Sequence, residues 1–145
     1  MAVPFRFDTV LRVREAERDR CRQALGLEQQ REAELIAERE RFTTERLAVL
    51  DALRLAHQGH GLTADQELAR RQYAEHLAAE VRRVSGALDE TCKMIALRRT
   101  EVLEADTAVK ALEKLAGRHV SEQQRLEQAS SERDRDDIRR TGRVA

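Results

Sequence analysis

The 145-residue chain has few of the side chains that build a compact core. Tryptophan is absent, and the aromatic residues amount to three phenylalanines and one tyrosine, although such residues usually supply much of the buried area of a globular domain. Proline occurs once and glycine six times, too few for a chain of several domains joined by linkers. These absences favour an elongated, helical structure in a single structural unit.

Long hydrophobic runs and an excess of one charge are also missing. No apolar run approaches the roughly 18 residues of a membrane span, and the N-terminus lacks the apolar stretch of a signal peptide. Lys+Arg and Asp+Glu each number 27, giving a formal net charge of zero, whereas a nucleic-acid-binding protein normally concentrates positive charge. We therefore expect a cytoplasmic protein that neither binds nucleic acid nor inserts into a membrane.

The sequence predicts no catalytic, cofactor or metal site. A structure of two helices has no cavity that would desolvate its carboxylates and shift their pKa values, and there is no glycine-rich phosphate loop. His57 and His60 lack a third ligand for a metal ion. Cys21 and Cys92 have neither a metal-binding spacing nor a disulfide framework. We expect a non-enzymatic protein.

The residues that are abundant predict long helices. Ala, Glu, Leu, Arg and Gln dominate, and these residues favour helix. The only cluster of helix breakers contains Gly59 and Gly61, and the segment from Thr63 to Gln66 that follows it has the pattern of a capping box. Asp8 is the expected N-cap of the first helix. We predict a helix over 9–57, a turn over 58–62, a helix over 64–137 and a flexible tail over 138–145.

Both predicted helices carry an apolar seam spaced by alternating steps of three and four residues, as in a coiled coil. Two long helices joined by a short turn run antiparallel, so the numbers of facing residues sum to about 120 and Leu11 faces Val109. In this register Cys21 is offset from Cys92 by roughly 10 Å along the axis, too far for a disulfide. The predicted fold is all-α: a two-helix antiparallel coiled-coil hairpin with an overhanging C-terminal helix.

The overhang and an arginine stripe are candidate binding features. The overhanging seam is only weakly apolar, so either a partner or the segment of Phe5 and Phe7 would complete it. Arg14, Arg18 and Arg22 repel one another at four-residue spacing. They either pair across the hairpin with acidic residues such as Glu101 and Asp106 or face an acidic partner.

The aromatic residues fall into two groups, Phe5 with Phe7 at the open end and Phe42 with Tyr73 toward the turn. Packing in the seam is one interpretation of the second group. Two helices cannot fully bury an aromatic ring, however, so these residues are also candidate anchors for another protein.

The opening from Phe5 to Glu15, FRFDTVLRVRE, resembles the N-terminus of the FliJ family, small coiled-coil proteins of the flagellar type III export apparatus. A glycine-containing turn, Tyr73 followed by Leu77, the LEKL sequence at 112–115 and the charged run at 132–137 are also similar to that family. The resemblance covers nearly the whole chain. It implies a stalk-like hairpin that inserts its open end into the hexameric export ATPase, contacts the export gate with its turn half and handles export chaperones.

The resemblance gives each group of candidate residues a partner. The expected ATPase-binding residues at the open end are Phe5, Phe7, Arg14, Arg18, Leu115, Arg118 and Val120. The expected surface for the cytoplasmic domain of the export gate, a membrane protein, comprises Leu35, Arg39, Phe42, Arg46, Tyr73 and Leu77. Such a protein would serve flagellum biogenesis, and hence chemotaxis, at the cytoplasmic side of the inner membrane. A generic scaffold or spacer, or the related stalk of a virulence type III secretion system, remains an alternative.

Overall fold

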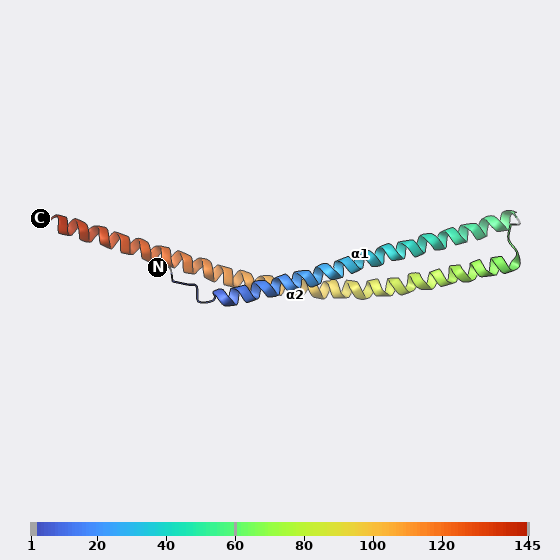
Figure 1. Ribbon diagram of the computed structural model, residues 1–145, viewed down its shortest axis with the longest axis horizontal. Coiled ribbons are helices and arrows are strands. Elements are labelled where there is room, and N and C mark those ends of the chain that lie inside the picture. The colour runs from blue at the N-terminus through green and yellow to red at the C-terminus, as the bar shows by residue number, and fades with distance from the viewer. Residues whose placement is uncertain (1–2, 60, 145) are drawn as a thin grey trace. The chain divides into compact units, whose positions relative to one another are not determined.

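The computed structural model describes residues 3–59 and 61–144. It contains two α-helices, α1 (Asp8–Gly59) and α2 (Ala64–Gly142), and no strand in the described residues (Figure 1). The predicted all-α fold, with two long helices packed against each other, is confirmed. The contacts divide the chain into a turn-side unit, Arg22–Thr100, and a terminal unit, Met1–Cys21 with Glu101–Ala145.

The capping box predicted for the second helix is present at the start of α2. The backbone N–H of Gln66 donates to Thr63 Oγ1 at 3.3 Å, and the backbone N–H of Thr63 donates to Gln66 Oε1 at 3.2 Å. The carbonyl of Thr63 accepts the next bond, from Glu67 N–H at 3.0 Å. These reciprocal bonds satisfy amide groups that have no partner at a helix start.

The start of α1 differs from the prediction by one residue. The carbonyl of Phe7 accepts the first bond of the helix, from Leu11 N–H at 2.8 Å, and Asp8 N–H donates to Phe5 O. Asp8 is therefore the first residue inside the helix and not its N-cap. Its carboxylate lies 3.1 Å from Arg12, and a negative charge in the first turn also interacts favourably with the helix dipole.

The ends of both helices extend beyond the predicted bounds. Gln58 and Gly59, predicted as turn, belong to α1, while His60 lies outside the described residues. The predicted tail at 138–145 is wrong for 138–142, because α2 continues to Gly142. The Thr141 hydroxyl donates to Asp137 O at 2.9 Å, and basic residues in the last turn interact favourably with the negative end of the dipole.

The core of the turn-side unit lies along the predicted seam. Thr91 is a buried polar residue there, and its hydroxyl donates to Ala87 O at 2.9 Å, so burial does not leave it unsatisfied. The buried apolar side chains of this unit are Leu53 of α1 and Ala74, Leu77, Val84, Leu88 and Ile95 of α2.

Contacts between α1 and α2 in the turn-side unit show that the helices run antiparallel near the predicted register. The Tyr73 hydroxyl bonds Glu45, Arg83 lies 3.2 Å from Glu38 and Cys92 Sγ lies 3.8 Å from Glu32 Oε1. In these pairs the residue number on α1 decreases as the residue number on α2 increases. The residue numbers of each pair sum to about 120, as expected for a hairpin with this turn.

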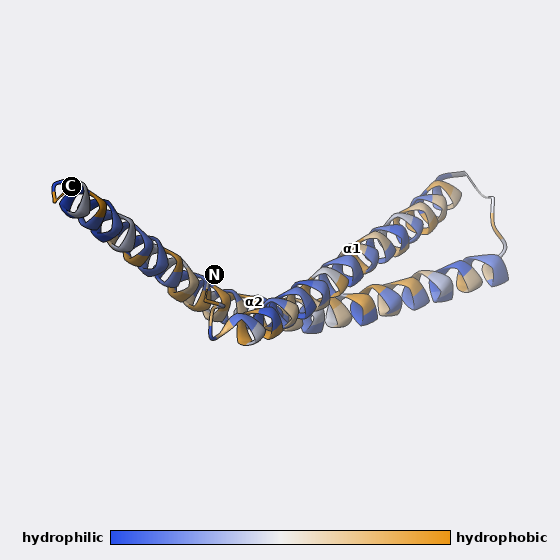
Figure 2. Ribbon diagram, turned by 60° about the vertical axis from the view of Figure 1, so that its left-hand side comes forward, coloured by the Kyte–Doolittle hydropathy of each residue, from blue (hydrophilic) through white to orange (hydrophobic). Residues whose placement is uncertain are grey.

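In the terminal unit α2 is covered over only part of its length. Val109 is fully buried. Farther along, the segment before α1 lies against α2, where His119 Nε2 is 2.9 Å from Val3 O and the Phe5 and His119 rings are 5.7 Å apart. The N-terminal segment thus covers the weak part of the seam at His119, whereas Leu126 farther along stays exposed. Every described residue from 124 to 144 is exposed, and this part of α2 is mostly hydrophilic (Figure 2).

Candidate protein-binding surfaces

The terminal unit displays an aromatic cluster on α2. The rings of Phe5 and Phe7 meet edge to face with centroids 5.8 Å apart, and the Arg6 guanidinium lies 5.5 Å from the Phe7 centroid. His119 holds Phe5 through the ring contact described above. Phe5 is half-buried, whereas Phe7 is 39% exposed. Local packing therefore orders both rings without covering Phe7.

The predicted open-end residues of α2 are also exposed. Leu115 and Val120 keep 41% and 54% of their surface. Arg118 is exposed beside a shallow depression that Lys114, Ser121 and Arg125 also line. The depression is lined by basic side chains together with Gly117 and Glu122, and its shallow, polar form does not suit a small molecule.

Two arginines of the predicted stripe lie close to acidic residues of their own helix, α1. Arg14 pairs with Glu17 at 3.0 Å, and Arg18 Nε lies 3.7 Å from Asp19. Arg22, Glu101 and Asp106 each take part in further interactions. Arg14 is exposed and Arg18 is half-buried, and the charge of each is partly neutralised by its acidic neighbour.

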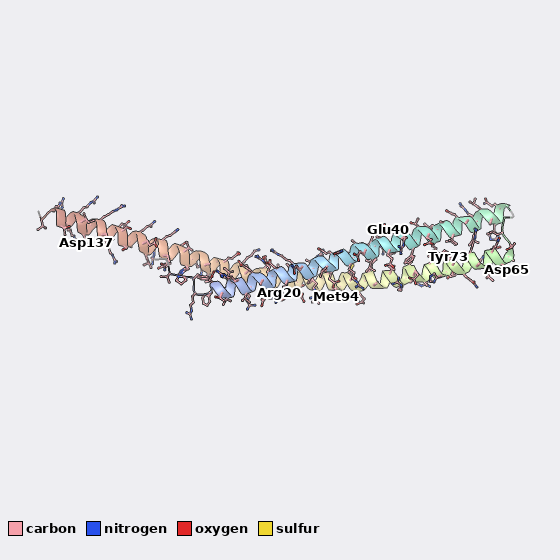
Figure 3. The ribbon with its side chains drawn as sticks, in the orientation of Figure 1. Arg20, Glu40, Asp65, Tyr73, Met94 and Asp137 are labelled. Atoms are coloured by element: carbon pink, nitrogen blue, oxygen red, sulfur yellow. The ribbon has the colours of Figure 1, made fainter. Side chains whose placement is uncertain are left out.

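Tyr73 is a point of contact between the two helices of the turn-side unit (Figure 3). Its hydroxyl on α2 donates to the Glu45 carboxylate on α1, and its ring stacks on His76 with centroids 6.4 Å apart. The hydrogen bond to Glu45 raises the pKa of Tyr73, and partial desolvation and the Glu45 charge raise it further. The ring is still 42% exposed, so Tyr73 both connects the helices and remains accessible.

The other residues predicted for the gate surface differ in accessibility. Phe42 is half-buried beneath Arg41, whose guanidinium lies 5.2 Å from the ring centroid. Leu77, in contrast, is only 2% exposed. A direct contact between Leu77 and a partner, as the sequence suggested, is ruled out while the hairpin is closed, because its side chain fills the seam. The remaining half-buried residues of this set are Leu35, Arg39 and Arg46.

A second polar contact between the two helices, an ion network around Arg83, was not predicted. Arg83 contacts Glu80 at 2.8 Å on its own helix and Glu38 at 3.2 Å on α1. The hydrogen bond from Arg83 lowers the pKa of Glu80, and the bond to Glu80 is the main reason that the pKa of Arg83 is raised. The register itself was the signal that could have found these pairs, since it places Glu38 near Arg83 and Glu45 near Tyr73.

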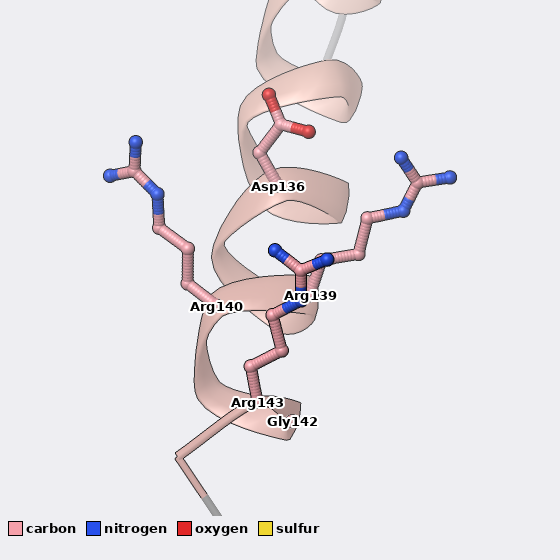
Figure 4. A pocket seen from close by; sticks show the side chains of 5 residues that line it. All are labelled: Asp136, Arg139, Arg140, Gly142 and Arg143. Atoms are coloured by element: carbon pink, nitrogen blue, oxygen red, sulfur yellow. The ribbon is translucent and has the colours of Figure 1, made fainter.

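The end of α2 carries a basic cluster that does not form a binding site for a single ligand. Arg139, Arg140 and Arg143 surround the last turn next to Asp136. Their guanidinium groups point in different directions (Figure 4). They therefore present positive charge without converging on one ligand.

Other kinds of site are not evident in the described residues. No group of three or more His, Cys, Asp and Glu side chains that could hold a metal ion occurs in 3–59 or 61–144. His57 lies 3.1 Å from Glu67, while His60 is outside the described residues. Cys21 and Cys92 are free. Within the same ranges neither helix has a stretch that is long and apolar enough to cross a membrane.

Comparison with known proteins supplies the family. The model of the family described as "Flagellar FliJ protein" matches residues 3–141, which include nearly all of both helices and every residue of the two predicted surfaces. Comparisons with curated proteins and with solved structures gave no match. The match extends far beyond half of the chain, and the helical hairpin agrees with it. The chain therefore belongs to the FliJ family of coiled-coil proteins related to flagellar export.

Proposed function

We propose that this protein is a stalk of the flagellar type III export apparatus that links the hexameric export ATPase to the export gate and handles export chaperones. It would act in the cytoplasm, peripherally at the inner-membrane apparatus. The observation that supports this proposal is the presence of accessible aromatic groups in two separate units, Phe5 with Phe7 in one and Tyr73 with Phe42 in the other.

The proposed ATPase-binding surface is the aromatic cluster of the terminal unit with its neighbours. Phe7, Leu115 and Val120 offer exposed apolar area, and Arg14, Arg18 and Arg118 offer positive charge. Aromatic and arginine side chains are the residues that most often dominate binding energy at interfaces. Because Phe5 and Phe7 are already ordered against each other, little side-chain entropy is lost when a partner binds.

The proposed export-gate surface is centred on Tyr73 and Phe42, with Leu35, Arg39 and Arg46 around them. Tyr73 is held by Glu45 and His76 but keeps much of its ring exposed. Leu77 supports this surface from the core and does not touch the gate. A fixed, half-exposed aromatic ring is a good anchor, because binding removes its remaining apolar surface from water at a small cost in conformational freedom.

A generic spacer is the main alternative, and the flagellar family match favours the flagellar system over a virulence system. A spacer would need its length and its helices but no particular aromatic side chain. The proposal requires that Tyr73 and Phe7 each support one partner, so point variants separate the two functions.

The test measures ATPase and gate affinities on the same folded variants. Tyr73→Ala and Phe42→Ala should weaken gate binding by about 30-fold, the effect of losing an aromatic anchor, and leave ATPase binding intact. Phe7→Ala should show the reverse pattern. A loss of both affinities in any one variant with full helicity would contradict the assignment of separate surfaces.

A matched pair of truncations locates the ATPase surface on α2. A chain that ends at Gly117 lacks Arg118, His119 and Val120 and should lose ATPase binding. A chain that ends at Gln124 retains all of them and should bind normally. Loss of binding in both truncations would move the site to the exposed end of α2.

A further inference from the structure

The turn-side unit has two unlike sides. On the side of Tyr73, bonds from Tyr73 to Glu45 and from Arg83 to Glu38 connect the two helices and satisfy the polar groups between them. Elsewhere in the same unit α1 and α2 border a groove of about 370 Å³. The groove is lined by Arg46, Leu50, Leu53, Arg71, Gln72, Ala74 and Glu75.

The groove is apolar at its base, and Arg46, Arg71, Gln72 and Glu75 are its polar lining residues. Leu53 and Ala74 are buried there, and Leu50 is 38% exposed. Leu47 precedes Leu50 by three residues on α1, and Leu68 precedes Arg71 by three on α2, so each shares a helix face with a lining residue. Both are 56% exposed. In a chain with 37% charged residues, leucines that flank a groove form an exposed apolar patch of the kind that marks a protein interface.

Arg46 adds to this patch a positive charge that has no ion-pair partner in the described residues. Its Nε is buried and has no hydrogen-bond partner, and Arg46 makes no ion pair within 3–59 or 61–144. Arg71, the other arginine of the groove, already pairs with Glu67 at 2.6 Å. Because the Nε is covered, an incoming carboxylate would pair with the terminal guanidinium nitrogens of Arg46, and this charge-assisted bond would form in a partly desolvated site.

We propose that this groove binds an amphipathic helix of a partner protein, whose apolar residues pack between α1 and α2 and whose carboxylate pairs with Arg46. A groove between two packed helices accepts the side-chain ridges of a third helix. The lining residues of α1 span Arg46 to Leu53, about two helical turns. The partner helix therefore needs apolar residues at spacings of three and four with one Asp or Glu among them.

This groove shares Arg46 with the proposed gate surface, but the two aromatic anchors of that surface, Tyr73 and Phe42, do not line it. The inference does not depend on the proposed function, since binding of a helix to the isolated chain tests it directly. If the gate proposal fails, the groove is still measurable. If the groove fails, the Tyr73 surface is unaffected.

The test uses the full-length chain and two synthetic helical peptides as probes. Both peptides carry leucines at spacings of three and four, and they differ only in one Glu or Gln next to the leucine stripe. The Glu peptide should bind, as measured by fluorescence anisotropy. The Gln peptide should bind about 30-fold more weakly, the usual cost of removing one partner of a buried, hydrogen-bonded charge pair.

Variants of the chain assign the effect to the groove. Arg46→Gln should reduce affinity for the Glu peptide by about 30-fold and should barely change affinity for the Gln peptide. Leu50→Asp, at a partly exposed position, should abolish binding of both. Arg54→Gln is the matched control, because Arg54 pairs with Asp51 and does not line the groove. Tyr73→Ala should leave peptide binding unchanged.

Several results would overturn the proposal. They are failure of the Glu peptide to bind, equal affinities for the two peptides, and binding that is insensitive to Arg46→Gln. A change in the chain's own mass by light scattering on Arg46→Gln would assign the groove to a second copy of the chain instead. If Arg46→Gln lowers helicity, the Leu50→Asp variant serves as the test instead. Peptide binding by a folded Leu50→Asp variant would then refute binding in the groove.

Discussion

Two stretches of α2 show how differently one helix can be stabilised. Between Ala64 and Thr100, in the turn-side unit, α2 buries a seam against α1. From 124 to 142 every residue of α2 is exposed, although the helix continues. Charge pairs such as Arg125 with Glu122 at 2.7 Å stabilise the exposed stretch locally. Helix formation and burial are thus separate properties of this chain, and each can be disturbed alone.

The largest expected difference comes from removing a leucine in each stretch. Leu77 is 2% exposed, whereas Leu126 is 53% exposed. Leu77→Ala should lower the free energy of unfolding by about 2–5 kcal/mol, because it leaves a cavity in the seam. Leu126→Ala should change it by less than about 0.5 kcal/mol. Denaturant unfolding followed by circular dichroism measures both, and equal losses would contradict the distinction between the stretches.

The two ends of α2 should respond differently to loss of a threonine hydroxyl. Thr63→Ala removes the N-cap bond to Gln66 and should cost about 1 kcal/mol. Thr141→Ala removes a bond to Asp137 O in the last exposed turn and should cost less than about 0.5 kcal/mol. Thermal unfolding of the two variants compares them. A smaller effect at Thr63 than at Thr141 would show that the start of α2 frays in the native protein.

Removing the exposed stretch should barely affect the rest of the fold. Of the described residues, a chain that ends at Gln124 loses only exposed ones, so its free energy of unfolding should lie within about 0.5 kcal/mol of the full chain. Denaturant unfolding gives the value, and the chain that ends at Gly117 is the comparison. That shorter chain also loses His119 and its contacts with Val3 and Phe5. A large loss in the Gln124 chain would mean that the exposed stretch contributes contacts after all.

The smallest effect concerns the titration of Tyr73. Its pKa is raised by Glu45, so the stability that it contributes is present below the unfolded-state pKa of about 10 and is lost as the pH rises through the folded-state value. Glu45→Gln should lower the pKa of Tyr73, and Glu40→Gln should not. Near-ultraviolet absorbance reports tyrosinate formation at this residue alone, because the chain has one tyrosine and no tryptophan. An unchanged titration in Glu45→Gln would mean that the bond is absent in solution.

The fold was largely predictable because it depends on periodic and local signals. Apolar spacing located the seam, two glycines located the turn, and the residues from Thr63 to Gln66 located the start of α2. The errors lie at the helix ends, where single bonds decide the bounds. Asp8 is a suitable cap by residue type, but the Phe7 carbonyl accepts the first helical bond. At the other end, α2 continues past the predicted bound to Gly142, where the Thr141 hydroxyl bonds Asp137 O and the last turn is basic.

The candidate surfaces were less predictable, because they depend on side-chain packing between helices. The sequence placed Tyr73 and Leu77 in one surface, but only the packed structure shows that Leu77 fills the core while Tyr73 stays exposed. Likewise, Arg46 was grouped with Tyr73, and the structure places it in a groove that Tyr73 does not line. Periodicity identifies which residues approach the seam. It does not determine how far each side chain is covered.

The central claim is that one chain carries two separate binding surfaces, and assembly of a three-component complex tests it most directly. The chain is mixed with the export ATPase and the cytoplasmic domain of the export gate, and the mass of the complex is measured by size-exclusion chromatography with light scattering. We predict one complex that contains all three proteins, from which Tyr73→Ala removes only the gate and Phe7→Ala only the ATPase. Mutually exclusive binding of the two partners to the wild-type chain would contradict the account.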